Sequence, residues 1–164
     1  MVESLVKAFI LMNKIVLILS LVAFLFNAGC KPDDIFTGDC FVPERNVNYT
    51  INMDLPEYFN LRNLGEYLEL AGGNRGVYVI HDFDDNYVAI ERTCTYRSDD
   101  SCAQVVLDPE SLQLRCGSFD SKDDFVPCCG SAYSFNGSLL GGPSRCRLKT
   151  YRLSRQGNTL YIAN

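Results

Sequence analysis

Short strand-like segments alternate with turn residues along most of the chain, and this alternation limits the folds open to it. β-branched and aromatic residues dominate segments such as 76–80 and 87–90, and Asp, Asn, Gly and Pro fill the intervals between segments. Turn sequences of this kind are Asp84-Asp85-Asn86, Asp108-Pro109-Glu110, Asn136-Gly137 and Gln156-Gly157-Asn158. Asn-Gly is the strongest short hairpin signal. Closely spaced turns are typical of small all-β domains, so we expect an antiparallel β-sandwich or barrel. The one candidate helix covers residues 60–70, and its apolar residues match helical spacing poorly.

An apolar segment, residues 15–26, lies near the N-terminus, and Ser20 is its only polar residue. As a helix it would be about 18 Å long at 1.5 Å per residue, which is too short for a hydrocarbon core of about 30 Å. Lys14 precedes the segment, and the small residues Ala28 and Gly29 follow it. This order is typical of a secretory signal rather than of a buried core helix. We therefore expect residues 1–29 to be a signal peptide.

The end of that signal, Asn27-Ala28-Gly29-Cys30, resembles the lipoprotein box of bacteria, in which small residues precede a lipid-modified Cys. Asn27 stands where an aliphatic residue is usual. The resemblance implies that Cys30 carries acyl chains that anchor the protein in the cell envelope, at the periplasmic face or in the outer membrane of a bacterium. A plain secreted protein with Cys30 in a disulfide is the alternative. If Cys30 is lipidated, residues 30–48 form the lipidated Cys and a tether, and residues 49–164 form the β domain.

Charge and histidine content exclude some functions. Lys and Arg number 15 against 20 Asp and Glu, a formal net charge of −5. A nucleic-acid surface needs clustered basic residues, so we expect no nucleic-acid partner. The chain has one histidine, His81, so it cannot supply two imidazoles to any site. Ser131 and Ser134 have no neighbouring histidine, and no catalytic constellation is evident.

From Gly76 onward, the order of motifs resembles the Rieske iron–sulfur domain. In that family a hairpin precedes a Cys-x-His loop and then a Cys-x-x-His-Gly-Ser loop, followed by an aromatic strand, a Gly turn and a Gly-Pro loop. The corresponding segments here are Thr93-Cys94-Thr95-Tyr96, Val126-Pro127-Cys128-Cys129-Gly130-Ser131, residues 132–135, Asn136-Gly137 and Leu140-Gly141-Gly142-Pro143. The resemblance implies a Rieske-like β domain in which two loops converge on the cluster position.

The cluster ligands of that family are largely replaced. A Rieske cluster holds one iron by two Cys and the other by two His. Matching through Gly130-Ser131 places Cys94 at the first Cys and Tyr96 at the first His. It places Val126 at the second Cys and Cys129 at the second His. Valine cannot bind iron, and the chain has one of the two imidazoles that the cluster requires. A standard cluster is therefore excluded, and we expect no cofactor.

A non-standard [2Fe-2S] cluster or a zinc ion is the alternative. Either would need four thiolates. Cys94, Cys116, Cys129 and one of Cys102 or Cys128 are the candidates. The C-x-x-C pairs that usually mark such sites are absent from this sequence.

Disulfides are the other use for these cysteines, because an exported chain enters an oxidising compartment. The family resemblance implies a Cys102–Cys128 bond between the two loops. Cys94 and Cys129 would face each other across the vacated cluster position and could also join. Cys40–Cys146 would tie the tether to the domain. With Cys30 lipidated, seven cysteines remain, so at least one is unpaired or intermolecular.

These observations favour an exported, membrane-anchored lipoprotein whose Rieske-like domain lacks a standard cluster and has a structural or binding role. Its membrane contact would be the N-terminal lipid. One alternative is an electron carrier with a [2Fe-2S] cluster on thiolate-rich ligands. Another is a thiol–disulfide redox protein that uses Cys128-Cys129.

Overall fold

The computed structural model describes Lys14 and residues 40–164. The expected signal peptide, Cys30 and the first part of the tether lie outside these residues. Within the described part, no helix combines the length and apolarity needed to cross a membrane.

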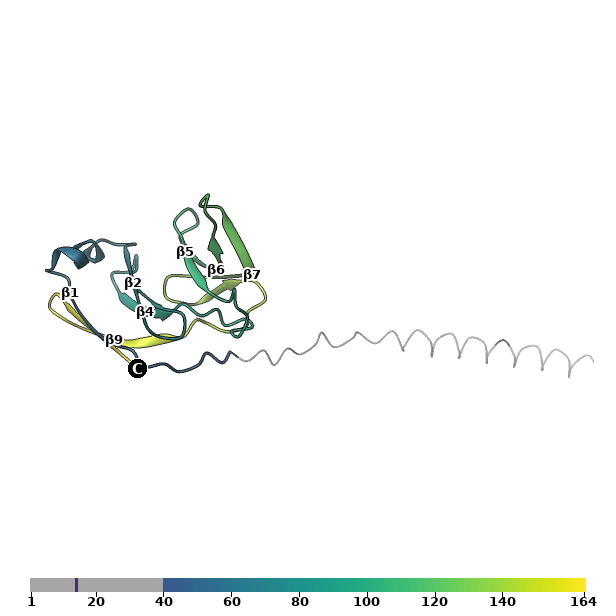
Figure 1. The fold of residues 1–164 in the computed structure, drawn as a ribbon, viewed down its shortest axis with the longest axis horizontal. Helices are drawn as coiled ribbons and strands as arrows, with labels where there is room; N and C mark the ends of the chain where they lie inside the picture. Colours follow the sequence, from purple (N-terminus) through teal and green to yellow (C-terminus); the bar gives the residue numbers. More distant parts are fainter. Residues whose placement is uncertain (1–13, 15–39) are drawn as a thin grey trace, which may run out of the picture. The chain divides into compact units, whose positions relative to one another are not determined.

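Strands dominate the described residues and form two antiparallel sheets (Figure 1). The six-stranded sheet has the order β1-β10-β9-β4-β3-β2, and the four-stranded sheet has the order β5-β6-β7-β8. The strands are β1 (Asn48–Asn52), β2 (Tyr67–Leu70), β3 (Val77–His81), β4 (Tyr87–Glu91), β5 (Val105–Asp108), β6 (Gln113–Phe119), β7 (Phe125–Tyr133), β8 (Leu139–Gly141), β9 (Thr150–Gln156) and β10 (Thr159–Ala163). The expected antiparallel all-β fold is confirmed.

The hairpins follow the turn sequences. β3 pairs with β4, β5 with β6, β7 with β8 and β9 with β10. Gly137 and Gly157 have φ angles of +79° and +59°, and Asp85 adopts +62°. Glycine enters this left-handed region without steric cost, and Asp tolerates it better than most residues. Local turn chemistry therefore sets most of the strand order.

The helix considered over residues 60–70 does not form. The 3-10 helix η1 (Pro56–Arg62) ends early in that range, and β2 occupies its end. Gly65 has a φ of +82°, which interrupts a helical path between them. Leu68 and Leu70 then alternate with more exposed residues, and β2 pairs with β3. Pairing with an existing strand outweighs the weak helical pattern.

The packed part of the chain begins before β1. Val42 and Val47 are buried, and the Asn164 side chain accepts a hydrogen bond from the Val47 N–H at 2.9 Å. Part of the expected tether is therefore folded onto the domain.

Buried residues form two clusters. One lines the six-stranded sheet, with Ile51, Val79 and Leu160 among its members. The other includes Tyr78, Leu114 and Tyr133 and also contains Cys94 and Cys116, with Cys128 and Cys129 packed against it. Buried free cysteine behaves as a small apolar side chain. The sulfur atoms of Cys94 and Cys116 thus belong to the core.

A buried carboxylate fixes the chain just before Cys94. Glu91 is fully buried and accepts hydrogen bonds from the backbone N–H groups of Asn74, Arg75 and Thr93 and from the hydroxyls of Thr93 and Tyr151. Burial, and then the hydrogen bond to Glu91, raise the pKa of Tyr151. A buried charge is tolerated only when it is well hydrogen-bonded. Glu91 therefore holds the end of β4 against the turn that precedes β3.

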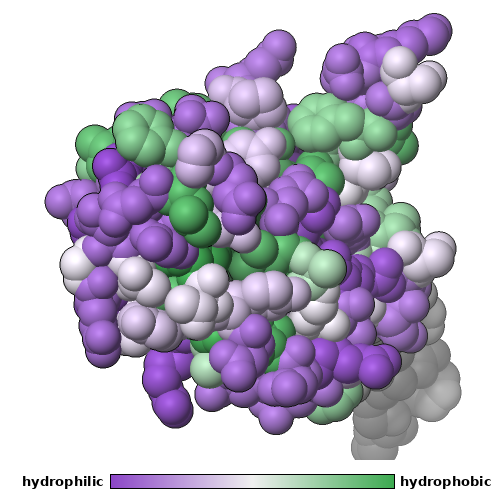
Figure 2. Space-filling model, turned by 60° about the vertical axis from the view of Figure 1, so that its left-hand side comes forward, coloured by the Kyte–Doolittle hydropathy of each residue, from purple (hydrophilic) through white to green (hydrophobic). Residues whose placement is uncertain are grey.

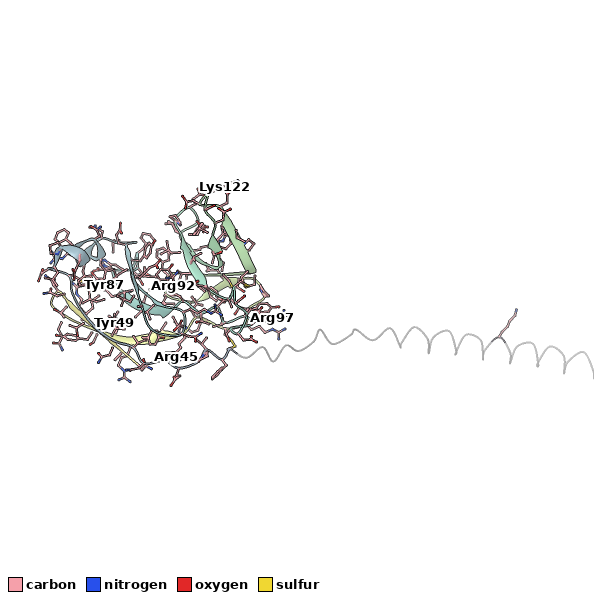
Figure 3. All side chains as sticks on the ribbon, in the orientation of Figure 1. Arg45, Tyr49, Tyr87, Arg92, Arg97 and Lys122 are labelled. Carbon is pink, nitrogen blue, oxygen red and sulfur yellow. A yellow bond between two sulfur atoms is a disulfide. The ribbon has the colours of Figure 1, made fainter. Side chains whose placement is uncertain are left out.

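A cleft of about 570 Å³ is lined by residues of β2, β3, β5 and β6 and by the β6–β7 turn. Arg92, labelled in Figure 3, binds Glu69 at 2.6 Å. Arg115 binds Asp108 at 2.7 Å and lies 3.8 Å from the centre of the Phe125 ring. Both arginines of the cleft are therefore paired with carboxylates.

On the face shown in Figure 2, apolar residues are interspersed with hydrophilic ones.

Candidate thiol and metal centre

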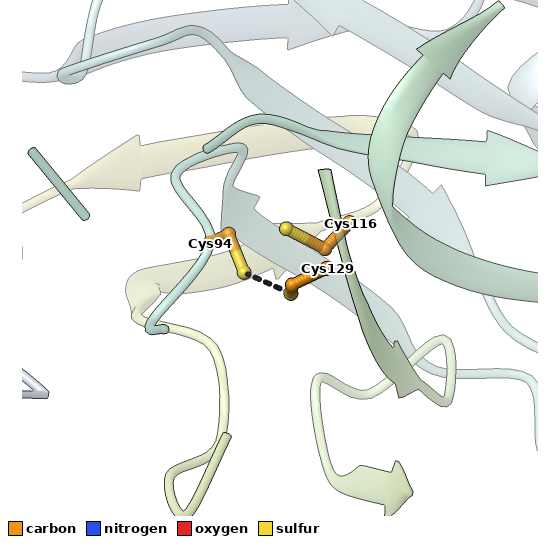
Figure 4. Close-up of side chains that lie close together, drawn as sticks. All are labelled: Cys94, Cys116 and Cys129. Atoms are coloured by element: carbon orange, nitrogen blue, oxygen red, sulfur yellow. Dashed lines mark hydrogen bonds between the residues drawn. The ribbon is translucent and has the colours of Figure 1, made fainter. Parts of the chain in front are cut away.

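Three thiols from separate parts of the chain meet in the core. Cys94 follows β4, Cys116 lies in β6 and Cys129 lies in β7. Their Sγ atoms all lie within 4.8 Å of one another, and those of Cys94 and Cys129 are 3.7 Å apart (Figure 4). Cys94 and Cys116 are fully buried, whereas Cys129 is partly exposed.

An irregularity in the β6–β7 ladder brings Cys129 to Cys116. Arg115 pairs with Ala132 and Gly117 pairs with Pro127, so residues 128–131 stand opposite Cys116 alone. Gly117 allows the two strands to approach here, since a Cβ at this position would lie 2.3 Å from the Val126 carbonyl oxygen. Bulged segments of this kind redirect side chains away from the regular alternation.

A buried hydroxyl cluster fixes the chain around Cys94. The Thr95 hydroxyl lies 3.0 Å from the Tyr133 hydroxyl and 2.8 Å from the Ser144 hydroxyl, and it donates to the Cys146 carbonyl at 3.1 Å. The Tyr133 hydroxyl lies 3.7 Å from the Cys94 Sγ. This network ties the first loop to β7 and to the segment that follows β8.

The segment after β8 also packs directly on the second loop. Gly142 has a φ of +98°, and a Cβ there would lie 2.2 Å from the Gly130 carbonyl oxygen. The Ser131 hydroxyl accepts a hydrogen bond from the Ser144 N–H at 3.0 Å. The Gly-Pro loop predicted from the family resemblance thus supports the backbone next to Cys129.

Two disulfides flank the thiols, Cys40–Cys146 and Cys102–Cys128. Both pairs were named from the sequence. Cys128 is the neighbour of Cys129, so its bond to Cys102 attaches β7 to the loop that carries Cys94. The third expected pair, Cys94 and Cys129, is not joined, because their 3.7 Å separation far exceeds a disulfide bond of about 2.03 Å. The third thiol, Cys116, lies beside them.

The pKa values of Cys94 and Cys116 shift in opposite directions. The contact with the Cys116 thiol lowers the pKa of Cys94 to about 6, against the opposing effect of burial. The same contact, together with burial, raises the pKa of Cys116. Of these two thiols, Cys94 therefore ionises before Cys116. Burial raises the pKa of Tyr133 to about 12, so its phenol is neutral near pH 7.

The ligand set of a standard Rieske cluster is not assembled. His81 lies in β3, binds Asp85 through Nε2 at 2.8 Å and stacks on Tyr87. Val126 is 48% exposed and carries no donor atom. Tyr96 packs against the core cluster that contains Cys94. Of the family-matched positions, only Cys94 and Cys129 bring donors together, so a cluster with two imidazoles does not fit this chain.

The expectation of no cofactor is nevertheless wrong for this fold. Cys94, Cys116 and Cys129 form a group of soft donors able to hold a metal ion, and none of them is used in a disulfide. The alternative set of four thiolates is not available, because Cys102 and Cys128 are bonded to each other. The sequence does hold one signal for Cys116: it is two residues from the buried Leu114, so both side chains face the core from one strand.

The sulfur spacing suits a single ion. A tetrahedral thiolate site with metal–sulfur distances of about 2.3 Å has sulfur–sulfur distances of about 3.8 Å. The Cys94–Cys129 separation is 3.7 Å, and Cys116 is within 4.8 Å of both. Thiolate ligands favour Cu(I), zinc and iron–sulfur clusters. A two-iron cluster needs two pairs of ligands, whereas three free thiols meet here.

No protein-family model matches the chain, and no curated protein matches it. Several solved structures are similar to it, among them the following two. One is the plasma membrane Rieske protein PetC3 from the cyanobacterium Synechocystis PCC 6803, with 24% identity, 58% of this chain and 84% of that chain covered, and a TM-score of 0.44. The other is the ferredoxin of carbazole 1,9a-dioxygenase from Nocardioides aromaticivorans IC177. The identity is 18%, 72% of this chain and 96% of that chain are covered, and the TM-score is 0.43. The first of these belongs to the family that the sequence resembles.

Proposed function

We propose that this domain contains a thiolate metal centre, in which Cys94, Cys116 and Cys129 bind one soft or borderline ion such as Cu(I) or Zn²⁺. The observation that carries the proposal is the convergence of three Sγ atoms within 4.8 Å, from residues that make no disulfide. The sequence offers these three cysteines among the candidate thiolate ligands, and the convergence of their Sγ atoms supports three of the four candidates.

The surroundings of Cys94 lower the proton cost of binding a metal ion through that ligand. Metal ions bind thiolates, so each ligand that is already ionised removes a proton cost from binding. Cys94 has its pKa lowered to about 6 and is therefore largely ionised at pH 7. The Thr95 hydroxyl network and the Cys102–Cys128 bond hold two of the ligand-bearing segments in place before the ion arrives.

The chemistry of the bound ion decides the role of the domain. A redox-inert ion such as Zn²⁺ would make the centre structural, whereas a redox-active ion would make the domain an electron carrier. A fourth ligand, where the ion requires one, would enter on the side of Cys129, the one partly exposed thiol of the three.

Export and lipid anchoring belong to the same proposal. Asn27-Ala28-Gly29-Cys30 and the apolar segment before it support cleavage ahead of Cys30 and acylation of its sulfur. The domain would then be attached to a membrane of the cell envelope. Mass spectrometry of the mature N-terminus should find an acylated Cys30, and Cys30→Ala should release the protein from the membrane fraction. An unmodified Cys30 in the mature chain would contradict anchoring.

A metal titration of the full chain, purified in detergent, tests the metal centre. Zn²⁺ and Cu(I) are each titrated against a chromophoric chelator, and we expect one ion per chain. Cys94→Ser, Cys116→Ser and Cys129→Ser should each weaken binding at least 10-fold, in line with the loss of one ligand. Val126→Ala is the matched control, because Val126 is exposed and stands where the Rieske family has its second Cys ligand. This variant should bind the metal ion as the unmodified chain does.

Two results would overturn the proposal. One is failure of the folded, reduced chain to compete with the chelator for either ion. The other is stable incorporation of two irons and two sulfides on reconstitution, which would establish an iron–sulfur electron carrier instead. Circular dichroism of every variant separates loss of ligands from loss of fold.

A further inference from the structure

The three thiols differ in access and in freedom to move. Cys129 is the only one that is partly exposed, and its neighbours Pro127 and Gly130 are exposed. Residues 128–131 lie outside the regular β6–β7 ladder. Cys116 is fully buried, and its backbone pairs with Val105 of β5. A small reagent therefore reaches Cys129 before either of the other thiols.

Cys94 is placed to react with whatever forms on Cys129. Its Sγ lies 3.7 Å from the Cys129 Sγ, and it sits on a loop rather than in a strand. Bond formation requires an approach of about 1.7 Å to reach the disulfide length of about 2.03 Å. Neither sulfur is held in a disulfide, so a shift of the two side chains can supply this movement.

We propose that Cys129 is a modification site for low-molecular-weight disulfides, and that Cys94 completes the reaction by forming a Cys94–Cys129 bond that removes two of the three metal ligands. The consequence for the metal rests on the proposed function, whereas the thiol reaction does not. Metal binding and disulfide formation then compete for the same two sulfur atoms.

The exchange balances without any further reagent. The Cys129 thiolate attacks one sulfur of the disulfide RSSR, forming a Cys129–SR bond and releasing RS⁻. The Cys94 thiolate then attacks the Cys129 Sγ, which forms the Cys94–Cys129 bond and breaks the bond to the second RS⁻. The two protons of the cysteine thiols end on the two RSH products. One RSSR is reduced, and two cysteines are oxidised.

Oxidised glutathione is the probe for this reaction. The full, metal-free chain is incubated with it and analysed by intact mass and by peptide mapping under non-reducing conditions. We expect loss of two hydrogens and a Cys94–Cys129 cross-link, with Cys102–Cys128 unchanged. Cys94→Ser should instead accumulate one glutathione on Cys129, and Cys129→Ser should take up none at the cluster.

Cys116→Ser is the matched control, because it removes a metal ligand but neither partner of the exchange. It should still form the Cys94–Cys129 bond. Zn²⁺ added before glutathione should slow the cross-link at least 10-fold in the unmodified chain, and dithiothreitol should restore zinc binding after oxidation.

An unreactive chain, or a cross-link that maps to Cys116 or Cys128, would overturn this inference. A cross-link that forms normally in a chain unable to bind zinc or Cu(I) would overturn the proposed metal centre and leave the exchange reaction standing. Strong zinc binding with no reaction at Cys129 would overturn the exchange reaction and leave the proposed metal centre standing.

Discussion

Cys94 and Cys129 are 35 positions apart in the chain, yet their sulfur atoms lie 3.7 Å from each other. The Cys102–Cys128 disulfide holds the same two loops together one residue away from Cys129. The loops are thus fixed by one pair of cysteines, which leaves a second pair, with Cys116, free to bind or react.

Removal of the Cys116 thiol should change the ionisation of Cys94. Since the Cys116 thiol lowers the pKa of Cys94 to about 6, Cys116→Ala should raise that pKa. Cys116→Ser keeps a hydroxyl donor and should raise it less. The pH dependence of thiolate absorbance in the metal-free chain measures both. An unchanged pKa in Cys116→Ala would show that another group stabilises the Cys94 thiolate.

The contact of the Gly-Pro loop with the second loop should be sensitive to a single methyl group. Gly142→Ala would place a Cβ 2.2 Å from the Gly130 carbonyl oxygen at a φ of +98°, so residues 128–131 must move. We expect a lower melting temperature and weaker metal binding. Gly141→Ala is the control, because nothing lies within 4 Å of its added Cβ. Equal behaviour of the two variants would contradict this packing.

The hairpins were accessible from the sequence because their signals are local. Asn136-Gly137 predicts the β7–β8 turn from two residues, and the structure has Gly137 at a φ of +79°. The members of the thiol cluster were named from the sequence as candidate ligands, but its geometry was not accessible in this way. It depends on the register shift that sets residues 128–131 opposite Cys116, and no local pattern in the sequence encodes that shift. The expectation of no cofactor rested on the replaced family ligands, and the three thiols that meet in the core overturn it.

The buried Glu91 network should contribute measurably to stability. Tyr151→Phe removes a hydrogen bond to a buried carboxylate and should lower the free energy of unfolding by about 1.5–3 kcal/mol. Tyr161→Phe is the control, since Tyr161 is exposed on the same sheet. Urea denaturation without reductant measures both. An effect of Tyr151→Phe no larger than that of its control would remove Glu91 as an anchor of the first loop.

The Asp108–Arg115 pair predicts how stability depends on pH. Burial alone would raise the pKa of Asp108, but hydrogen bonds from Arg115, Ser111 and nearby backbone N–H groups outweigh it and lower the pKa. A carboxyl whose pKa is lower in the folded state stabilises the fold above its unfolded pKa of about 3.9. That contribution is lost as the pH falls through the folded pKa.

Asp108→Asn should therefore lower the melting temperature at pH 7, and the difference from the unmodified chain should shrink below about pH 4. Thermal unfolding from pH 7 to pH 2.5 follows this difference. A gap that stays constant over the whole range would show that the carboxylate charge of Asp108 does not matter.

X-ray absorption at the zinc edge of the full chain, loaded with one equivalent of Zn²⁺, is the most direct measurement of the thiolate centre. We expect three sulfur neighbours of the zinc ion at about 2.3 Å, and two in Cys116→Ser. A zinc ion surrounded only by oxygen and nitrogen atoms would contradict it.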